Sequence, residues 1–168
     1  WFSEAIGLPC RLVRFHPEGR RLASAKWTGA VEAPTLFADA FPLLVASTAS
    51  LADVNDKLAA AGRDPIPMNR FRPNLVIDGI DAFEEDYADT IAVGGAVIKP
   101  VKPCGRCSVP SVDQASGASG PDPLDILQSY RGKPQLDGEI CFGMNSIVLA
   151  GDGARLAVGQ QVDLTLAF

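Results

Sequence analysis

The stretch Ile91-Ala-Val-Gly-Gly-Ala-Val-Ile98 contains two short apolar runs, Ile91–Val93 and Ala96–Ile98, on either side of two glycines. Short runs of β-branched and apolar residues are typical of strands, and glycine is typical of the turns between them. Four more runs of this kind occur along the chain, at 43–46, 75–77, 147–149 and 162–166. Together they predict a mostly β domain, and we expect a barrel with a ligand pocket at its mouth.

Two segments have the residue spacing of amphipathic helices. The first begins at Ser50, whose hydroxyl we expect to cap it, and ends at Gly62. The second begins at Asp122, has Pro123 in its first turn and ends at Gly132. Each has apolar residues along one face: Leu51, Val54 and Leu58 in the first, and Leu124, Leu127 and Tyr130 in the second. We therefore expect a few peripheral helices packed against the sheet.

Length and charge limit the possible classes of protein. The chain has 168 residues, 47% of them apolar, which is enough for one compact core, so residues 1–168 are expected to form a single domain. A net charge of −5 argues against a nucleic-acid partner, because it gives no general basic surface. The apolar runs are far shorter than the roughly 20 residues of a membrane span, so no membrane association is expected.

The four cysteines do not resemble the disulfide framework of a small secreted protein. Cys10 and Cys141 stand alone, whereas Cys104 and Cys107 form a tight pair. This distribution favours a reducing, cytoplasmic location.

The segment Lys102-Pro-Cys-Gly-Arg-Cys-Ser-Val-Pro110 is the most distinctive in the chain, and four interpretations compete for it. The cysteines could be small buried apolar residues, or a thioredoxin-like redox pair, although Ser108-Val-Pro110 is unsuited to the helix that such a pair needs. Structural zinc would need four protein ligands, and His16 is the only histidine. The fourth interpretation is a single thiolate that binds a metal-containing cofactor.

Motifs on both sides of this segment resemble, in their order and spacing, those of MOSC domains. The similarity extends over most of the chain and is greatest to the YcbX-like proteins and the mitochondrial amidoxime-reducing component. The matching motifs are Trp1-Phe, Asn69-Arg-Phe-Arg-Pro-Asn-Leu-Val-Ile77, Glu85-Asp86, Ile91-Ala-Val-Gly94, Pro103-Cys-Gly-Arg-Cys107, Val112-Asp113 with Gly117, Ser129-Tyr-Arg131 and Val158-Gly-Gln-Gln-Val-Asp-Leu164.

The resemblance implies a β-barrel that binds the molybdenum cofactor, Mo-molybdopterin, with Cys107 as the sulfur ligand of the metal. Cys104 is left without an assigned role. The family as a whole is also associated with pyridoxal phosphate. The residues that the resemblance places around the phosphate and pterin are Ser47, Thr48, Ser50, Arg72, Asn74, Arg106 and Asn145, where eukaryotic relatives carry a tyrosine at the last position.

Residue chemistry gives independent reasons for part of this set. A predicted helix N-terminus with hydroxyl side chains favours phosphate, although ordinary helix capping explains Ser50 alone. Arg72 precedes Pro73 and an apolar strand, and an arginine held there can make a forked contact with phosphate. The alternative is an ordinary surface arginine. Asp86 belongs to an acidic run that is either solvated or orients Arg72 or Arg106 through a buried ion pair.

The activity that the resemblance implies is a two-electron reduction of a small N-hydroxylated compound, whose oxygen leaves as water. Electrons would come from a ferredoxin-type protein or a flavin reductase. The start at Trp1 without Met predicts that an upstream segment has been removed, and the resemblance implies an N-terminal β-rich domain there. The main alternative is a non-enzymatic carrier or docking module for molybdenum cofactor or sulfur. A third possibility is thiol–disulfide exchange between Cys104 and Cys107.

Overall fold

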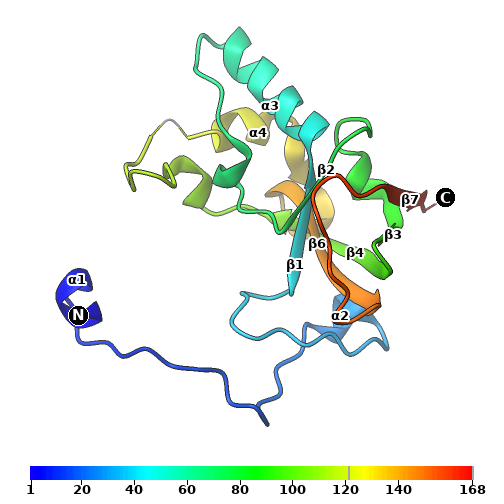
Figure 1. Ribbon diagram of the computed structural model, residues 1–168. Coiled ribbons are helices and arrows are strands. Elements are labelled where there is room, and N and C mark those ends of the chain that lie inside the picture. Colours follow the sequence, from blue (N-terminus) through cyan, green and yellow to red (C-terminus); the bar gives the residue numbers. More distant parts are fainter. Residues whose placement is uncertain (121, 168) are drawn as a thin grey trace.

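The computed structural model describes residues 1–120 and 122–167 (Figure 1). Within these residues the α-helices are α1 (Phe2–Ile6), α2 (Ala25–Thr28), α3 (Thr48–Ala60) and α4 (Leu124–Arg131). The strands are β1 (Leu43–Ser47), β2 (Leu75–Ile77), β3 (Ala88–Val93), β4 (Ala96–Gly105), β5 (Gly132–Lys133), β6 (Glu139–Ala150) and β7 (Val162–Leu166). The short 3-10 helices are η1 (Met68–Arg70), η2 (Glu84–Tyr87), η3 (Val109–Ser111) and η4 (Pro134–Leu136).

The strands form one seven-stranded sheet in the order β2-β1-β6-β4-β3-β7, with β5 paired to β6. Only β1 and β2 are parallel among the described pairs. The stretch Ile91–Ile98, with which the prediction of strands began, forms the β3–β4 hairpin, in which Ile91 lies opposite Ile98. Gly94 and Gly95 both have positive φ values, 55° and 86°, as a tight two-residue hairpin turn requires. All six predicted strands are confirmed in position, but β4 and β6 extend well beyond the predicted 96–98 and 147–149, and β5 is an addition.

The sheet is curled, because residues from its two ends pack together. Ile77 of β2 belongs to a buried cluster against which the half-buried Val162 and Leu164 of β7 pack. In a flat sheet the end strands of this path would lie about 24 Å apart, at five spacings of about 4.8 Å. The described strands curl into a half-barrel and do not close it, since no β2–β7 pairing occurs among them. The prediction of a mostly β, barrel-like fold with a few peripheral helices is confirmed.

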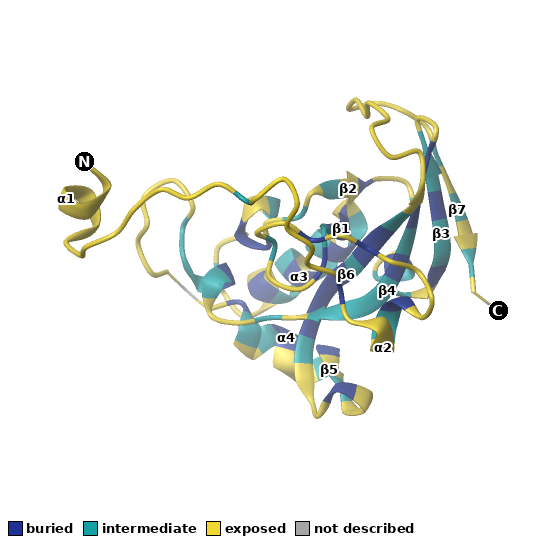
Figure 2. Cartoon of the chain, turned by 90° about the horizontal axis from the view of Figure 1, so that it is seen from below, coloured by how far each residue is buried: buried dark blue, intermediate teal, exposed yellow. Residues whose placement is uncertain are grey.

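Helices α3 and α4 cover one face of the sheet. They form a second core with Phe71 and Phe142, whose rings stack at 3.8 Å. Buried residues are concentrated along β6 and the neighbouring strands in Figure 2. The predicted cap of the first helix is wrong by three residues: Ser47 is the N-cap, and its hydroxyl accepts a hydrogen bond from the Ser50 amide at 3.0 Å. The second helix follows Asp122, whose carboxylate accepts a hydrogen bond from the Leu124 amide.

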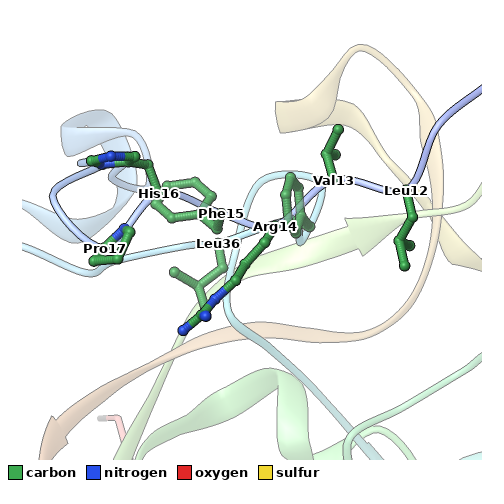
Figure 3. Close-up of a pocket in the computed structure, with 9 residues that line it drawn as sticks. Leu12, Val13, Arg14, Phe15, His16, Pro17 and Leu36 are labelled. Atoms are coloured by element: carbon green, nitrogen blue, oxygen red, sulfur yellow. The ribbon is translucent and has the colours of Figure 1, made fainter.

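The first twenty residues form an extended arm that leads away from the sheet (Figures 1 and 2). A hollow of about 680 Å³ lies where Leu12–Pro17 and Gly19 meet Leu36 and Phe37 (Figure 3). None of these residues belongs to the cysteine segment or to the motif that contains Arg72. Within the described part of the chain, no helix has the length and apolar character needed to cross a membrane.

Candidate functional site

The cysteine segment begins inside a strand and ends outside it. Cys104 and Gly105 are the last residues of β4, and Gly105 pairs with Cys141 of β6. The Glu139 carboxylate lies directly beside Gly105, where a Cβ atom would be 2.3 Å from it. Cys107 lies just beyond the strand, with an exposed and unpaired thiol. The structure therefore presents the second cysteine to ligands and holds the first in the sheet.

The side chain of Arg106 is directed into the protein. Its backbone amide donates to the Ile140 carbonyl oxygen at 2.8 Å, its Nη2 to the Phe71 carbonyl oxygen at 2.8 Å, and its Nη1 approaches Cys104 Sγ at 3.2 Å. The Nε atom is buried without a hydrogen-bond partner among the described residues. These contacts join the cysteine segment to the motif that carries Arg72.

Arg72 is exposed and lies in the left-handed backbone region, with φ 56°. With Asn69 and Gln114 it lines a hollow of about 400 Å³, and no hydrogen bond or ion pair engages its guanidinium among the described residues. Asn74 has a structural contact, because its Oδ1 accepts from the Leu44 amide at 2.8 Å. An unpaired arginine beside two amide side chains is suited to an anion.

Asn145 lies in the same row of the sheet as several of these residues. It pairs with Leu44 of β1 on one side and with Lys102 of β4 on the other. Asn74 is bonded to Leu44 in turn, so the row connects the Arg72 motif to the cysteine segment. The structure thus brings Asn74, Asn145 and the start of the cysteine segment into one row of the sheet. Their contact with a cofactor stays a prediction.

The predicted phosphate-binding serines belong to a buried hydrogen-bond network that includes Glu85. Ser47 and Ser50 are completely buried, and the Ser50 hydroxyl donates to Glu85 at 2.7 Å and accepts from the Phe83 amide at 2.7 Å. Thr48 is exposed, and its hydroxyl donates to Asp78. Capping and core hydrogen bonds therefore account for both serines, and their role toward a phosphate stays a prediction.

The expected partners of Asp86 are wrong. Its carboxylate, 4% exposed, pairs with Arg131 at 2.8 Å and with Lys133 at 2.9 Å, not with Arg72 or Arg106. Nor is the acidic run solvated, because Glu85 is completely buried. The pairing could not be predicted from local pattern, since 45 residues separate Asp86 from Arg131.

Sequence reasoning missed Arg70, which organises the loop after the cysteine segment. Arg70 is buried, donates to the Pro110 carbonyl oxygen at 3.3 Å and lies 3.5 Å from the Asp113 carboxylate. Hydrogen bonds from the Ser116 hydroxyl and amide, the largest causes, lower the pKa of Asp113 against an opposing effect of burial. The signal was present in two of the matching motifs, because one contains Arg70 and another contains Asp113.

Cys141 and Cys107 should differ strongly in reactivity toward iodoacetamide. Burial, followed by the nearby Glu139 charge, raises the pKa of Cys141 to about 11, whereas Cys107 is exposed. At pH 8 we expect fast alkylation of Cys107 and almost none of Cys141, because the thiolate is the reactive form. The pKa of Cys141 in the folded state lies above the ordinary value of 9.0. Protonated Cys141 therefore contributes to the free energy of unfolding below about pH 9, and this contribution is lost as the pH rises toward 11. Peptide mass spectrometry measures the two alkylation rates, and equal rates at both cysteines would contradict the expected difference in reactivity.

The fold and the site together define a class of protein. It is a curled β domain with an exposed thiol at Cys107, an arginine without a side-chain partner among the described residues, and amide side chains beside that arginine. Among the described residues, no group of three or more His, Cys, Asp or Glu side chains could hold a metal ion by itself. A domain of this class can contribute one sulfur ligand to a metal cofactor and bind its anionic groups.

The chain belongs to the MOSC domain family, because the family model for the MOSC domain matches residues 32–163. Over 96% of its length the chain is 35% identical to the molybdenum cofactor sulfurase of Oryza sativa subsp. japonica, of which it covers 22%. Over 78% of its length it is 35% identical to mitochondrial amidoxime reducing component 2 of Homo sapiens, of which it covers 39%. The chain thus spans well under half the length of these relatives.

The solved structure of YiiM from Geobacillus stearothermophilus superposes on the chain with a TM-score of 0.48 at 19% sequence identity. The match covers 74% of this chain and 54% of YiiM.

Proposed function

We propose that this MOSC domain binds the molybdenum cofactor through Cys107 and reduces small N-hydroxylated compounds. The observation that carries the proposal is the position of Cys107. It is the one exposed member of the cysteine pair, and it follows Arg106, whose side chain connects this segment to the Arg72 motif. The relatives named for amidoxime reduction and for molybdenum cofactor sulfuration support a function connected with this cofactor.

The residues present are compatible with an anionic pterin cofactor. The Arg72 guanidinium is unpaired and lines a hollow with the amides of Asn69 and Gln114. Arg70 Nε is a buried donor without a hydrogen-bond partner among the described residues, and the Arg70 side chain contacts the Pro110 carbonyl oxygen at the end of the cysteine segment. A buried donor of this kind is uncommon in folded proteins and is suited to an oxygen-rich ligand.

The chain's own residues then have separate tasks. Cys107 holds the metal as a permanent thiolate ligand, and Arg72, with Asn74 and Asn145 nearby, holds the phosphate and pterin. When bound, the cofactor supplies a two-electron redox centre. The net reaction consumes two electrons and two protons and converts an N-hydroxyl group into N–H and water. Electrons come from a separate ferredoxin-type or flavin-containing donor, and the substrate is a small molecule.

The first test of this function is a reduction assay. The protein in its full natural length, purified from a host that makes molybdenum cofactor, should convert an amidoxime to the amidine with a chemical reductant. Chromatography of the amidine measures the product. We expect Cys104→Ser to keep most of the activity and Cys107→Ser to lose it.

A carrier or docking module would give a different result. The parent would retain molybdenum and pterin, or form a persulfide on Cys104 or Cys107 with a sulfur donor, without producing any amidine. Mass spectrometry detects the persulfide as an added sulfur atom. That outcome would replace the reductase proposal by the carrier, and a reversible Cys104–Cys107 disulfide without pterin would favour thiol exchange.

A further inference from the structure

Arg106 holds the peptide group that immediately precedes Arg72. Its Nη2 donates to the Phe71 carbonyl oxygen at 2.8 Å, and its guanidinium lies over the Phe71 ring, 5.5 Å from the centroid. The ring is fixed in turn, because Phe71 is completely buried and stacks on Phe142. Arg106 is thus bonded to a well-packed part of the core.

The same peptide group determines the backbone conformation of Arg72. This peptide group consists of the Phe71 carbonyl and the Arg72 N–H. The carbonyl oxygen accepts a hydrogen bond from Arg106, and the N–H donates to the Asn69 carbonyl oxygen at 3.2 Å. Rotation of this peptide plane changes the φ angle of Arg72, which is 56°. A left-handed conformation is unfavourable for a residue with a Cβ atom and persists only where neighbouring contacts enforce it.

The backbone of Arg106 is anchored as firmly as its side chain. Its amide donates to the Ile140 carbonyl oxygen at 2.8 Å, and Cys107 follows it directly. A charge-assisted bond from this anchored position therefore fixes the Arg72 motif relative to the exposed thiol.

We infer that Arg106 is a positioning residue, which sets the direction of the Arg72 side chain and does not itself bind the cofactor. This inference rests on the proposed function as far as the cofactor is concerned, and it revises the expectation that Arg106 is one of the cofactor's direct contacts. Arg72 is the binding group, and Arg106 acts through the Phe71–Arg72 peptide.

The first test needs no cofactor. We expect Arg106→Gln to speed amide hydrogen exchange at Arg72 by about tenfold in the metal-free protein, because the peptide loses a charge-assisted bond. Arg106→Lys, which keeps a charged donor, should recover part of the protection. Unchanged exchange at Arg72 in Arg106→Gln would overturn the inference.

Arg63 offers a matched control for this measurement. Its guanidinium also donates to a backbone carbonyl, that of Asp122 at 2.6 Å, and it pairs with Asp125 on α4. Arg63→Gln should leave exchange at Arg72 unchanged. Faster exchange in both variants would indicate general loosening of the fold and would also overturn the inference.

The second test is a double-mutant cycle on the molybdenum-loaded protein, with the half-time of molybdenum release after dilution as the readout. If Arg106 acts through Arg72, then Arg106→Gln should speed release in the parent but by less than about twofold in an Arg72→Ala background. If the two substitutions instead speed molybdenum release by factors that multiply in the double variant, Arg106 contacts the cofactor independently of Arg72, and the inference is overturned. If the parent holds no molybdenum, the proposed function fails, while the exchange measurement still decides the role of Arg106.

Discussion

Cys107→Ser should abolish molybdenum retention. We expect the parent to carry about one molybdenum per chain and the variant to keep less than about a tenth of that amount, because a hydroxyl replaces the exposed sulfur of the cysteine pair. The thiol is exposed and forms no disulfide, so the fold should be unaffected. Elemental analysis of the metal and fluorescence of the oxidised pterin measure the two parts of the cofactor separately.

Cys104→Ser is the matched control for this experiment. Cys104 lies in β4 beside the Arg106 guanidinium and is less exposed than Cys107. It should retain most of the molybdenum. Equal loss in both variants would indicate that the two thiols act together, and unchanged binding in Cys107→Ser would remove this residue as the metal ligand.

Asp86→Ala should have the largest effect on stability. The carboxylate is 4% exposed, and its loss leaves Arg131, 7% exposed, as a buried charge without an acidic partner. Removing one member of a buried pair typically lowers the free energy of unfolding by about 3–5 kcal/mol. Arg131 also lies 3.9 Å from the Phe83 ring and donates to the Cys141 carbonyl oxygen, so the disturbance should reach β6. Urea unfolding followed by tryptophan fluorescence or circular dichroism provides the measurement.

A surface pair provides the comparison for Asp86. Asp125 pairs with Arg63 at 2.8 Å, but its side chain is 64% exposed. Asp125→Ala should therefore change the free energy of unfolding by no more than about 1 kcal/mol, because solvent screens the pair and replaces its hydrogen bonds. Similar losses in the two variants would show that burial does not determine the contribution of Asp86.

Part of the candidate site was predictable because its signals are local. The spacing of Cys104 and Cys107, and the sequence that contains Arg72, identified two segments that the structure brings together through Arg106. The inward direction of Arg106 was not predictable. It depends on the carbonyl of Phe71, which is 35 residues away in the chain.

The positions of the strands followed from the sequence alone, but the lengths of β4 and β6 did not, because the predicted runs 96–98 and 147–149 became Ala96–Gly105 and Glu139–Ala150. Short apolar runs such as Ile91–Val93, separated by glycine turns, carry a local periodic signal that does not depend on distant partners. The cysteine motif and the family resemblance were likewise visible without coordinates.

Only the tertiary structure decided which charges meet. Asp86 pairs with Arg131 and Lys133 across 45 and 47 residues, and Ser47 caps α3 while Ser50 turns to Glu85. The reason is physical: a buried polar group must find a hydrogen-bond partner wherever the chain folds back beside it, and short-range spacing contains no record of that return.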